Sequence, residues 1–154
     1  MQQDDIRFSI QGQAGLVLID RPKALNALSF NMAVALRNQL AVWAEDEDVG
    51  HVVMAGSEAR AFCAGGDIRD LYNMAVAGDH NGIAVCFRAE YMAHMAVSEF
   101  PKPLVSLAHG IVMGGGAGLM QAGSHAIVTD TTRFAMPESA IGLYPDAGAS
   151  VFLG

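Results

Sequence analysis

Two glycine-rich segments of this chain could perform chemistry through their backbone rather than through their side chains. Residues 62–67 read Phe-Cys-Ala-Gly-Gly-Asp, and residues 109–116 read His-Gly-Ile-Val-Met-Gly-Gly-Gly. Each segment joins a predicted strand to a predicted helix, where unshielded N–H groups stabilise negative charge. A tight turn is the simpler interpretation of either segment alone. If both segments converge on one oxygen atom, however, their N–H groups form an oxyanion hole for a thioester.

Two acidic side chains near the end of the chain, Glu138 and Asp146, allow a structural and a catalytic interpretation. A carboxylate can activate water, attack a carbonyl, orient a substrate or relay protons. Two carboxylates in one apolar cleft push their pKa values apart, so that one stays protonated while the other is a base or nucleophile. The sequence leaves open which carboxylate has which role. As an alternative, Glu138 is a helix-capping or surface residue and Asp146 is a helix N-cap.

The remaining reactive side chains have simpler interpretations. Cys63 lies beside the first glycine segment without an adjacent base, which favours a buried and inert thiol. His109 precedes Gly110 at the end of a predicted strand, where a structural role is commoner than a catalytic one. Cys63 and Cys86 are too few for a disulfide scaffold and lack the spacing of metal ligands, so we expect no metal site.

Short apolar runs alternate with helical periodicities, and they define the elements that must position these groups. Strands are predicted at residues 8–10, 16–19, 51–55, 104–107 and 126–129, and helices after Ser29 and at residues 68–77, 83–99 and 115–122. The first two strands form a hairpin, and Ser29 is the expected N-cap of the first helix. Strands that alternate with helices indicate an α/β fold with crossover connections.

Two of the predicted helices have regular apolar stripes. The stripe of the first helix is expected to face a sheet, and it consists of Met32, Leu36, Leu40 and Trp43. The stripe of the helix at residues 83–99 recurs every four positions, and it consists of Ile83, Phe87, Tyr91 and Met95.

Composition and length set broad limits on the protein. The 154 residues are 52% hydrophobic and 16% charged, which is typical of one folded globular domain. The net charge of −7 disfavours nucleic acid and anionic membranes as partners, and the apolar runs are too short to span a bilayer. The first five residues lack the pattern of a secretory signal or transit peptide, so we expect a cytoplasmic protein. Because a new helix is predicted after Pro145 and the chain stops at Gly154, we expect a C-terminally incomplete fragment.

Four segments occur in an order that matches a known family. They are Arg21–Leu28, Phe62–Ile68, His109–Gly116 and Phe134–Leu143. Together they resemble the enoyl-CoA hydratase/isomerase (crotonase) family, and the resemblance covers almost the whole chain. It implies that residues 1–154 form a crotonase-type spiral of strand-strand-helix units that lacks its C-terminal helices. It also implies an acyl-CoA substrate between the two glycine segments, no cofactor besides the coenzyme A of that substrate, and a homotrimer or homohexamer.

The resemblance also assigns site residues by their position. It places the oxyanion hole on the backbone N–H groups of Ala64 and Gly115. The further substrate contacts that it implies are Gly65, Gly66, Asp67 and Glu90. For Glu90 the alternative is a position on a solvated helix face. Lys23 could bind the phosphates of coenzyme A or be an ordinary solvated lysine.

Departures from the family pattern indicate a particular activity. Hydratases of the family use two glutamates as acid and base; the later one matches Glu138, but the earlier one falls at Gly118, which has no side chain. Asp146 stands where hydratases commonly have glycine, and residues 137–146 and 87–92 are similar to those of 3-hydroxyisobutyryl-CoA hydrolases. The resemblance therefore implies hydrolysis of a short-chain hydroxyacyl-CoA, above all 3-hydroxyisobutyryl-CoA in valine degradation, with Glu138 and Asp146 as catalytic residues. The alternatives are a hydratase or isomerase that acts on an acyl-CoA, and a non-catalytic fragment retained for assembly.

Overall fold

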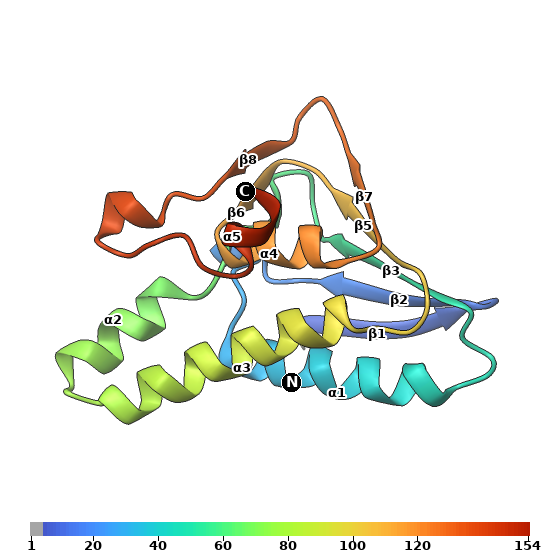
Figure 1. Cartoon of the computed structure of the whole chain (residues 1–154), viewed down its shortest axis with the longest axis horizontal. Helices are drawn as coiled ribbons and strands as arrows, with labels where there is room; N and C mark the ends of the chain where they lie inside the picture. Colours follow the sequence, from blue (N-terminus) through green and yellow to red (C-terminus); the bar gives the residue numbers. More distant parts are fainter. Residues whose placement is uncertain (1–4) are drawn as a thin grey trace.

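The computed structural model describes residues 5–154 as two β-sheets flanked by helices (Figure 1). The larger sheet has the strand order β1-β2-β3-β5-β7, and its strands are β1 (Ile6–Gln11), β2 (Ala14–Ile19), β3 (His51–Gly56), β5 (Leu104–Ala108) and β7 (His125–Val128). The smaller sheet has the order β4-β6-β8, and its strands are β4 (Ala61–Cys63), β6 (Ile111–Met113) and β8 (Arg133–Ala135). The helices are α1 (Phe30–Glu45), α2 (Ile68–Val76), α3 (His80–Ser98), α4 (Gly115–Ala122) and α5 (Ala149–Phe152), with 3-10 turns η1 (Pro22–Ala24) and η2 (Glu138–Ile141).

The larger sheet combines one hairpin with parallel crossovers. β1 and β2 pair antiparallel, whereas β2, β3, β5 and β7 pair parallel to one another in that order. Parallel neighbours require a crossover connection, which α1 supplies between β2 and β3. The predicted α/β fold, with its hairpin and crossovers, is therefore confirmed.

A strand-strand-helix pattern repeats along the chain. β3 is followed by β4 and then by α2 and α3, and β5 is followed by β6 and then by α4; β7 is again followed by a strand of the smaller sheet, β8. This winding confirms the predicted spiral. The sequence did not predict β4, β6 or β8, because each has only three residues and cannot display an alternating period.

Helix α1 packs on the larger sheet as its stripe predicts. The side chain of Ser29 accepts a hydrogen bond from the N–H of Met32 at 3.3 Å and so caps the helix. The members of the stripe are at most 2% exposed, and they are Met32, Leu36, Leu40 and Trp43. The contact with β2 is close, since a Cβ placed on Gly15 would lie 2.9 Å from the ring of Trp43.

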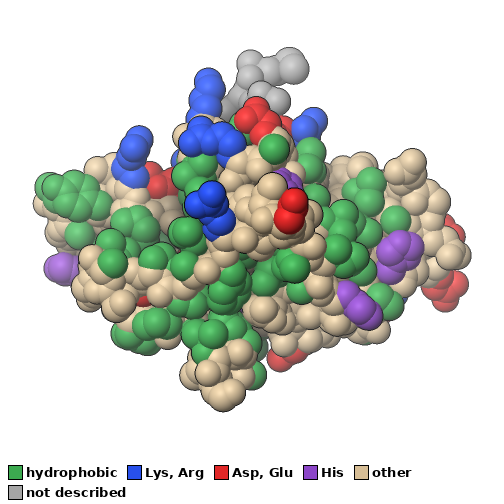
Figure 2. Space-filling model, turned by 90° about the horizontal axis from the view of Figure 1, so that it is seen from above, with side chains coloured by type: hydrophobic (Ala, Val, Ile, Leu, Met, Phe, Trp, Pro, Cys, Tyr) green, Lys and Arg blue, Asp and Glu red, His purple; other side chains and the backbone are tan. Residues whose placement is uncertain are grey.

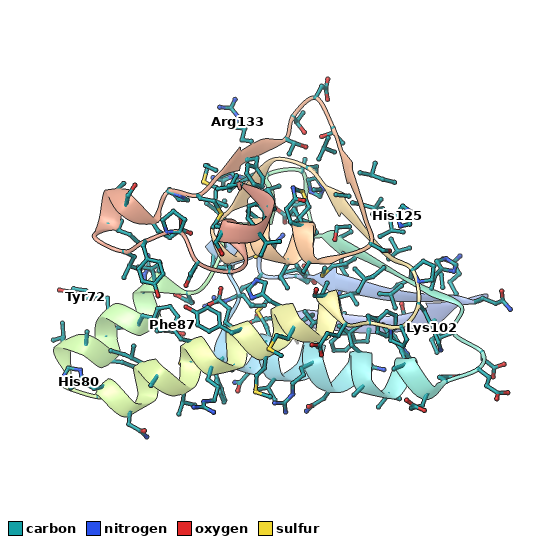
Figure 3. All side chains as sticks on the ribbon, viewed as in Figure 1. Tyr72, His80, Phe87, Lys102, His125 and Arg133 are labelled. Atoms are coloured by element: carbon teal, nitrogen blue, oxygen red, sulfur yellow. The ribbon has the colours of Figure 1, made fainter. Side chains whose placement is uncertain are left out.

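Helix α3 is also present, but its buried side is not the predicted stripe. The buried residues of α3 are small or polar, and they are Ala89, Ala93, His94 and Val97. Tyr91 and Met95 of the stripe are 37% and 55% exposed instead. Phe87, another member of the stripe, lies on the side of α3 that faces α2 and the C-terminal segment (Figure 3), and it lines two cavities there.

The surface is mixed in character. Figure 2 shows Lys and Arg side chains gathered in the upper half of one face, while hydrophobic side chains are spread across that face. Edge strand β7 exposes apolar side chains, with Ile127 at 54% and Val128 at 57%. Among residues 5–154, none of the helices combines the length and the apolar character that a membrane crossing demands.

Candidate active site

The two glycine segments face each other across a narrow gap. They leave the same edge of the smaller sheet, because β4 and β6 pair in parallel. A Cβ placed on Gly65 would lie 3.0 Å from the carbonyl oxygen of Met113 and 3.2 Å from the nitrogen of Gly115. A Cβ on Gly115 would lie 3.5 Å from the nitrogen of Gly66. Only residues without side chains permit this approach, so the predicted convergence of the two segments is present in the structure.

The geometry corrects one of the two predicted oxyanion donors. The N–H of Ala64 donates to the carbonyl oxygen of Leu25 at 3.1 Å, so it is committed within the protein, and the assignment of Ala64 was wrong. The N–H groups of Gly66 and Gly115 donate to no acceptor within residues 5–154. Gly115 is also the first residue of α4, where the helix dipole favours negative charge. The pair of free N–H groups is therefore that of Gly66 and Gly115.

The acceptor for Ala64 is fixed by a buried asparagine that the sequence did not single out. Asn26 is 1% exposed, and its side-chain amide donates to the carbonyl oxygens of Ser57 at 3.1 Å and Ala61 at 2.8 Å. Its oxygen accepts from the N–H of Arg21 at 2.9 Å. Asn26 thus ties the preceding loop to β4. Because Asn26 and its neighbour Leu25 adopt positive φ angles of 57° and 53°, sequence spacing could not show where the carbonyl of Leu25 points.

Asp67 has a structural role at the start of α2. Its carboxylate accepts from the side chain of Arg21 at 2.5 Å and from the N–H groups of Arg69 and Asp70, which makes it the N-cap. Burial acts to raise the pKa of Asp67, but Arg21 and the two N–H groups outweigh it and lower this pKa. Its carboxylate is thus engaged within the protein, and its predicted contact with a substrate stays a prediction.

Glu138 has a buried carboxylate beside the second glycine segment. It lies in η2 and is 8% exposed. One carboxylate oxygen lies 2.8 Å from the position of a Cβ on Gly114, and the other is buried without a hydrogen-bond partner in the described part of the chain. Glu138 is therefore neither a surface residue nor the cap of a helix. An unpaired buried carboxylate oxygen is costly, which indicates a site where water or a ligand binds.

Asp146 does not cap a helix either. The N-cap of α5 is Gly148, and Asp146 contributes only its backbone oxygen, which accepts from the N–H of Ala149 at 2.7 Å. The side chain of Asp146 turns toward α3 instead, where its Oδ2 accepts from the hydroxyl of Tyr91 at 2.5 Å. The carboxylate is therefore available to the site, as the catalytic prediction requires.

Glu90 brings a third carboxyl group to the gap between the glycine segments. Its Oε2 lies 2.6 Å from the position of a Cβ on Gly66, and its Oε1 lies against Gly115. Burial, followed by the charges of Asp146 and Glu138, raises the pKa of Glu90 from 4.5 to about 7. The side chain is therefore not on a solvated helix face, and it can hold or release a proton near neutral pH.

One cavity contains almost all the predicted site residues. It is lined by the three carboxylates, by residues of both glycine segments and by apolar side chains, namely Ala64, Gly65, Gly66, Ile68, Leu71, Phe87, Glu90, Gly114, Gly115, Pro137, Glu138, Ile141, Leu143 and Asp146. Asp67 lines an adjoining cavity that shares Leu71, Phe87 and Glu90 with the first. Neither cavity includes Lys23, so the structure adds no support for its contact with coenzyme A.

The position of Gly118 leaves no room for a second hydratase-type glutamate. A Cβ on Gly118 would lie 2.6 Å from the carbonyl oxygen of Ala147, 2.7 Å from its Cβ and 2.9 Å from Nε2 of His94. His94 is held in place, because its ring nitrogens lie 2.9 Å and 2.7 Å from the carbonyl oxygens of Glu90 and Gly115. Burial lowers the pKa of His94. Apart from its spacing of four residues from Glu90, nothing in the sequence singles out His94.

The cysteines and a basic hollow do not add to this site. Burial raises the pKa of Cys63 to about 12, so its thiol stays protonated and unreactive. Arg60 and Arg133 line a shallow hollow on another part of the molecule. Within residues 5–154, no group of three or more His, Cys, Asp or Glu side chains is arranged to bind a metal ion.

A spiral of strand-strand-helix units with two facing glycine segments and buried carboxylates defines a protein of the crotonase fold class. The family model for enoyl-CoA hydratase/isomerase matches residues 14–154, and the chain belongs to this family. Solved structures agree: an enoyl-CoA hydratase from Rhodobacter sphaeroides 2.4.1 is 43% identical with a TM-score of 0.92, and a carnitinyl-CoA dehydratase from Mycobacterium thermoresistibile is 38% identical with a TM-score of 0.91. The matches cover 96% of this chain and 44% and 43% of those two chains.

Curated relatives carry a more specific name. The 3-hydroxyisobutyryl-CoA hydrolase, mitochondrial, of Danio rerio is 43% identical over 149 residues, and that of Homo sapiens is 42% identical over 150 residues. Each match covers 97% of this chain but only 39% of the relative. The predicted cytoplasmic location is contradicted by these names, because the relatives are mitochondrial proteins.

Proposed function

We propose that this chain carries the active site of an acyl-CoA thioester hydrolase. The proposed reaction converts a short-chain hydroxyacyl-CoA, most specifically 3-hydroxyisobutyryl-CoA in valine degradation, into the free hydroxy acid and coenzyme A. One observation carries the proposal: the unpaired carboxylate of Glu138 and the side chain of Asp146 share a cavity with the free N–H groups of Gly66 and Gly115. The relatives named as hydrolases support the choice of substrate.

In the proposed mechanism, the thioester carbonyl oxygen accepts hydrogen bonds from the N–H groups of Gly66 and Gly115. These donors are fixed in the backbone, and they stabilise the negative charge that develops as the carbonyl carbon becomes tetrahedral. Glu138 either attacks this carbon or removes a proton from the water that attacks it. Asp146 orients the substrate or relays the proton. The carbon–sulfur bond then breaks, and coenzyme A takes a proton and leaves as the thiol. If Glu138 attacks directly, the bond formed is a mixed anhydride, which water hydrolyses to release the hydroxy acid and restore the carboxylate. Coenzyme A is part of the substrate rather than a separate cofactor.

Glu90 has a distinct part in this mechanism. Because its pKa is raised to about 7, its carboxyl group is protonated in a large fraction of molecules at neutral pH. A protonated carboxyl donates a hydrogen bond, which suits the hydroxyl group of a hydroxyacyl substrate. This role keeps Glu90 among the proposed substrate-binding residues, and it would favour a hydroxylated acyl group.

Hydration is the second candidate function, because the similar solved structures are named as hydratase and dehydratase. The packing of Gly118 against Ala147 and His94 argues against a second glutamate at that position. A non-catalytic role in assembly is the third candidate, and we further propose that the protein assembles as a homotrimer or homohexamer, as the family resemblance implies. Light scattering measures that assembly state directly.

The test supplies the protein with 3-hydroxyisobutyryl-CoA and, separately, with an enoyl-CoA. Hydrolysis predicts release of free thiol from the first ester, while the conjugated double bond of the second persists. Loss of the double bond without thiol release would assign hydration, and no change in either ester would favour the assembly role. Label found in the Glu138 carboxylate after a single turnover in ¹⁸O-labelled water identifies direct attack, since only an anhydride at Glu138 lets water add to that carboxyl carbon.

A further inference from the structure

Asp146 is bound by a tyrosine that lies outside the candidate catalytic cavity. The hydroxyl of Tyr91 donates to Oδ2 of Asp146 at 2.5 Å, a length typical of a charge-assisted bond between a hydroxyl and a carboxylate. The two residues are 55 positions apart, so the bond joins α3 to the C-terminal loop. Asp146 lines two cavities, whereas Tyr91 lines only the one that does not contain Glu138. Tyr91 therefore approaches Asp146 from the side opposite the proposed reaction.

We propose that Tyr91 is a positioning residue that fixes the carboxylate of Asp146. The proposal rests on the proposed function, in which Asp146 orients the substrate or relays a proton. The hydrogen bond restricts the rotation of the Asp146 side chain, so that the second oxygen, Oδ1, keeps a constant position.

The surroundings of Asp146 show why it requires such a donor. Within residues 5–154, the hydroxyl of Tyr91 is the only group that donates a hydrogen bond to this carboxylate. The following residues, Ala147 and Gly148, have left-handed φ angles of 46° and 86°, so the backbone turns sharply away and supplies no N–H of its own to the side chain.

The ionisable groups around Asp146 come from three parts of the structure. On α3 they are Glu90, Tyr91 and His94, on η2 the group is Glu138, and in the C-terminal loop it is Tyr144. Asp146 and Glu138 repel the charged form of Glu90, and burial holds His94 toward its neutral form. Among these groups, the hydroxyl of Tyr91 is the one that donates a hydrogen bond to Asp146.

The test replaces Tyr91 by Phe, which removes the hydroxyl and keeps the ring. Tyr72→Phe is the matched control, because Tyr72 is 66% exposed on α2 (Figure 3). The mobility of the Asp146 side chain is measured by ¹³C NMR relaxation in both variants and in the parent, and circular dichroism checks the fold. This measurement requires no turnover. The kcat and KM for 3-hydroxyisobutyryl-CoA are then measured for all three proteins.

In Tyr91→Phe we expect the Asp146 side chain to lose order, because its carboxylate loses the hydroxyl that restricts its rotation. We also expect kcat to fall about tenfold, with KM within about twofold of the parent. The Tyr72→Phe control should match the parent in both measurements. An Asp146 side chain that is as ordered in a folded Tyr91→Phe variant as in the parent would overturn the positioning role, whatever the turnover. If instead Asp146→Asn hydrolyses the ester at the parent rate, the part of Asp146 in the proposed function fails, while the relaxation measurement still decides whether Tyr91 holds the carboxylate.

Discussion

Helices α1 and α3 have similar apolar periodicities but use them in different ways. α1 buries its large apolar side chains, Leu36 among them, and presents polar residues to solvent. α3 buries small side chains such as Ala93 and turns the residues of its predicted stripe, including Phe87 and Tyr91, toward cavities. α1 therefore acts as scaffold except at its start, where Phe30 and Ala33 line the adjoining cavity, whereas α3 is both scaffold and one wall of the proposed site.

The difference shows what a helical period can and cannot predict. In α1 the stripe is bordered by polar residues such as Arg37 and Gln39, so that only one side can be buried. In α3, alanines and Val97 form a second apolar side, and the four-residue period does not show which of the two apolar sides is buried. The side with the small residues is the buried one, because small side chains allow α3 to approach its neighbours closely. A stripe on a helix with two apolar sides is therefore a candidate for ligand binding.

The largest effect on stability is expected from α1. Leu36→Ala removes a side chain that is 1% exposed, and we expect the free energy of unfolding to fall by about 2–5 kcal/mol. Val42→Ala on the exposed side of the same helix, where the side chain is 62% exposed, should change it by less than about 0.5 kcal/mol. Urea unfolding measures both values. Equal costs for the two variants would mean that α1 does not bury the side described.

A pH-dependent effect is expected from α3. The pKa of Glu90 is about 7 in the folded protein, compared with 4.5 for an unperturbed glutamate. The folded protein therefore binds the proton of the Glu90 carboxyl more tightly than the unfolded chain does. Stability from Glu90 is therefore fully present below about pH 4.5 and is lost as the pH rises to about 7. Glu90→Gln, which cannot ionise, should be more stable than the parent by up to about 3 kcal/mol at pH 8, with no gain at pH 4.5.

The matched control for this prediction lies on α1. Glu45 is exposed at the end of that helix, and Glu45→Gln should show the same small difference from the parent at both pH values. Urea unfolding at pH 4.5 and pH 8 gives the comparison. A Glu90→Gln variant whose stability follows the parent across this range would place Glu90 in solvent and contradict the site geometry.

A smaller effect is expected where α3 meets α4. Gly118→Ala places a methyl group against Ala147 and His94, and we expect a loss of about 1–3 kcal/mol in the free energy of unfolding. Gly50→Ala is the matched control, since a Cβ there meets nothing closer than 3.6 Å. Thermal unfolding followed by circular dichroism compares the two. A Gly118→Ala variant as stable as Gly50→Ala would show that position 118 can accept a side chain, and would restore the hydratase alternative.

Much of the fold follows from local patterns in the sequence. The bounds of α4 match the prediction at residues 115–122, and the Ser29 cap and the first hairpin also agree. These features depend on neighbouring residues, so a sequence displays them directly. β4, β6 and β8 were not predicted, because three-residue strands are defined by their partners rather than by their own period.

The site was predictable in part for the same reason. The glycine segments and the carboxylates of Glu138 and Asp146 are visible as residue types in a known order. The identity of the oxyanion-hole donors is not visible in the sequence, because it depends on the carbonyl of Leu25, which lies far from Ala64 along the chain. The contact of Tyr91 with Asp146 likewise joins residues 55 positions apart. Contacts of this kind require the three-dimensional arrangement of α3 and the C-terminal loop.

The central claim is that Glu138 acts on a thioester held at the two glycine segments, and turnover by Glu138→Gln tests it most directly. The substitution keeps the size of the side chain and removes its ability to ionise. The measurement is thiol release from 3-hydroxyisobutyryl-CoA, together with the affinity for the ester and a circular dichroism spectrum. We predict a loss of turnover of about 10²–10⁴-fold, with the fold intact and the affinity within about twofold of the parent. A parent that releases no thiol, or a folded Glu138→Gln variant that releases it at the parent rate, would contradict the claim.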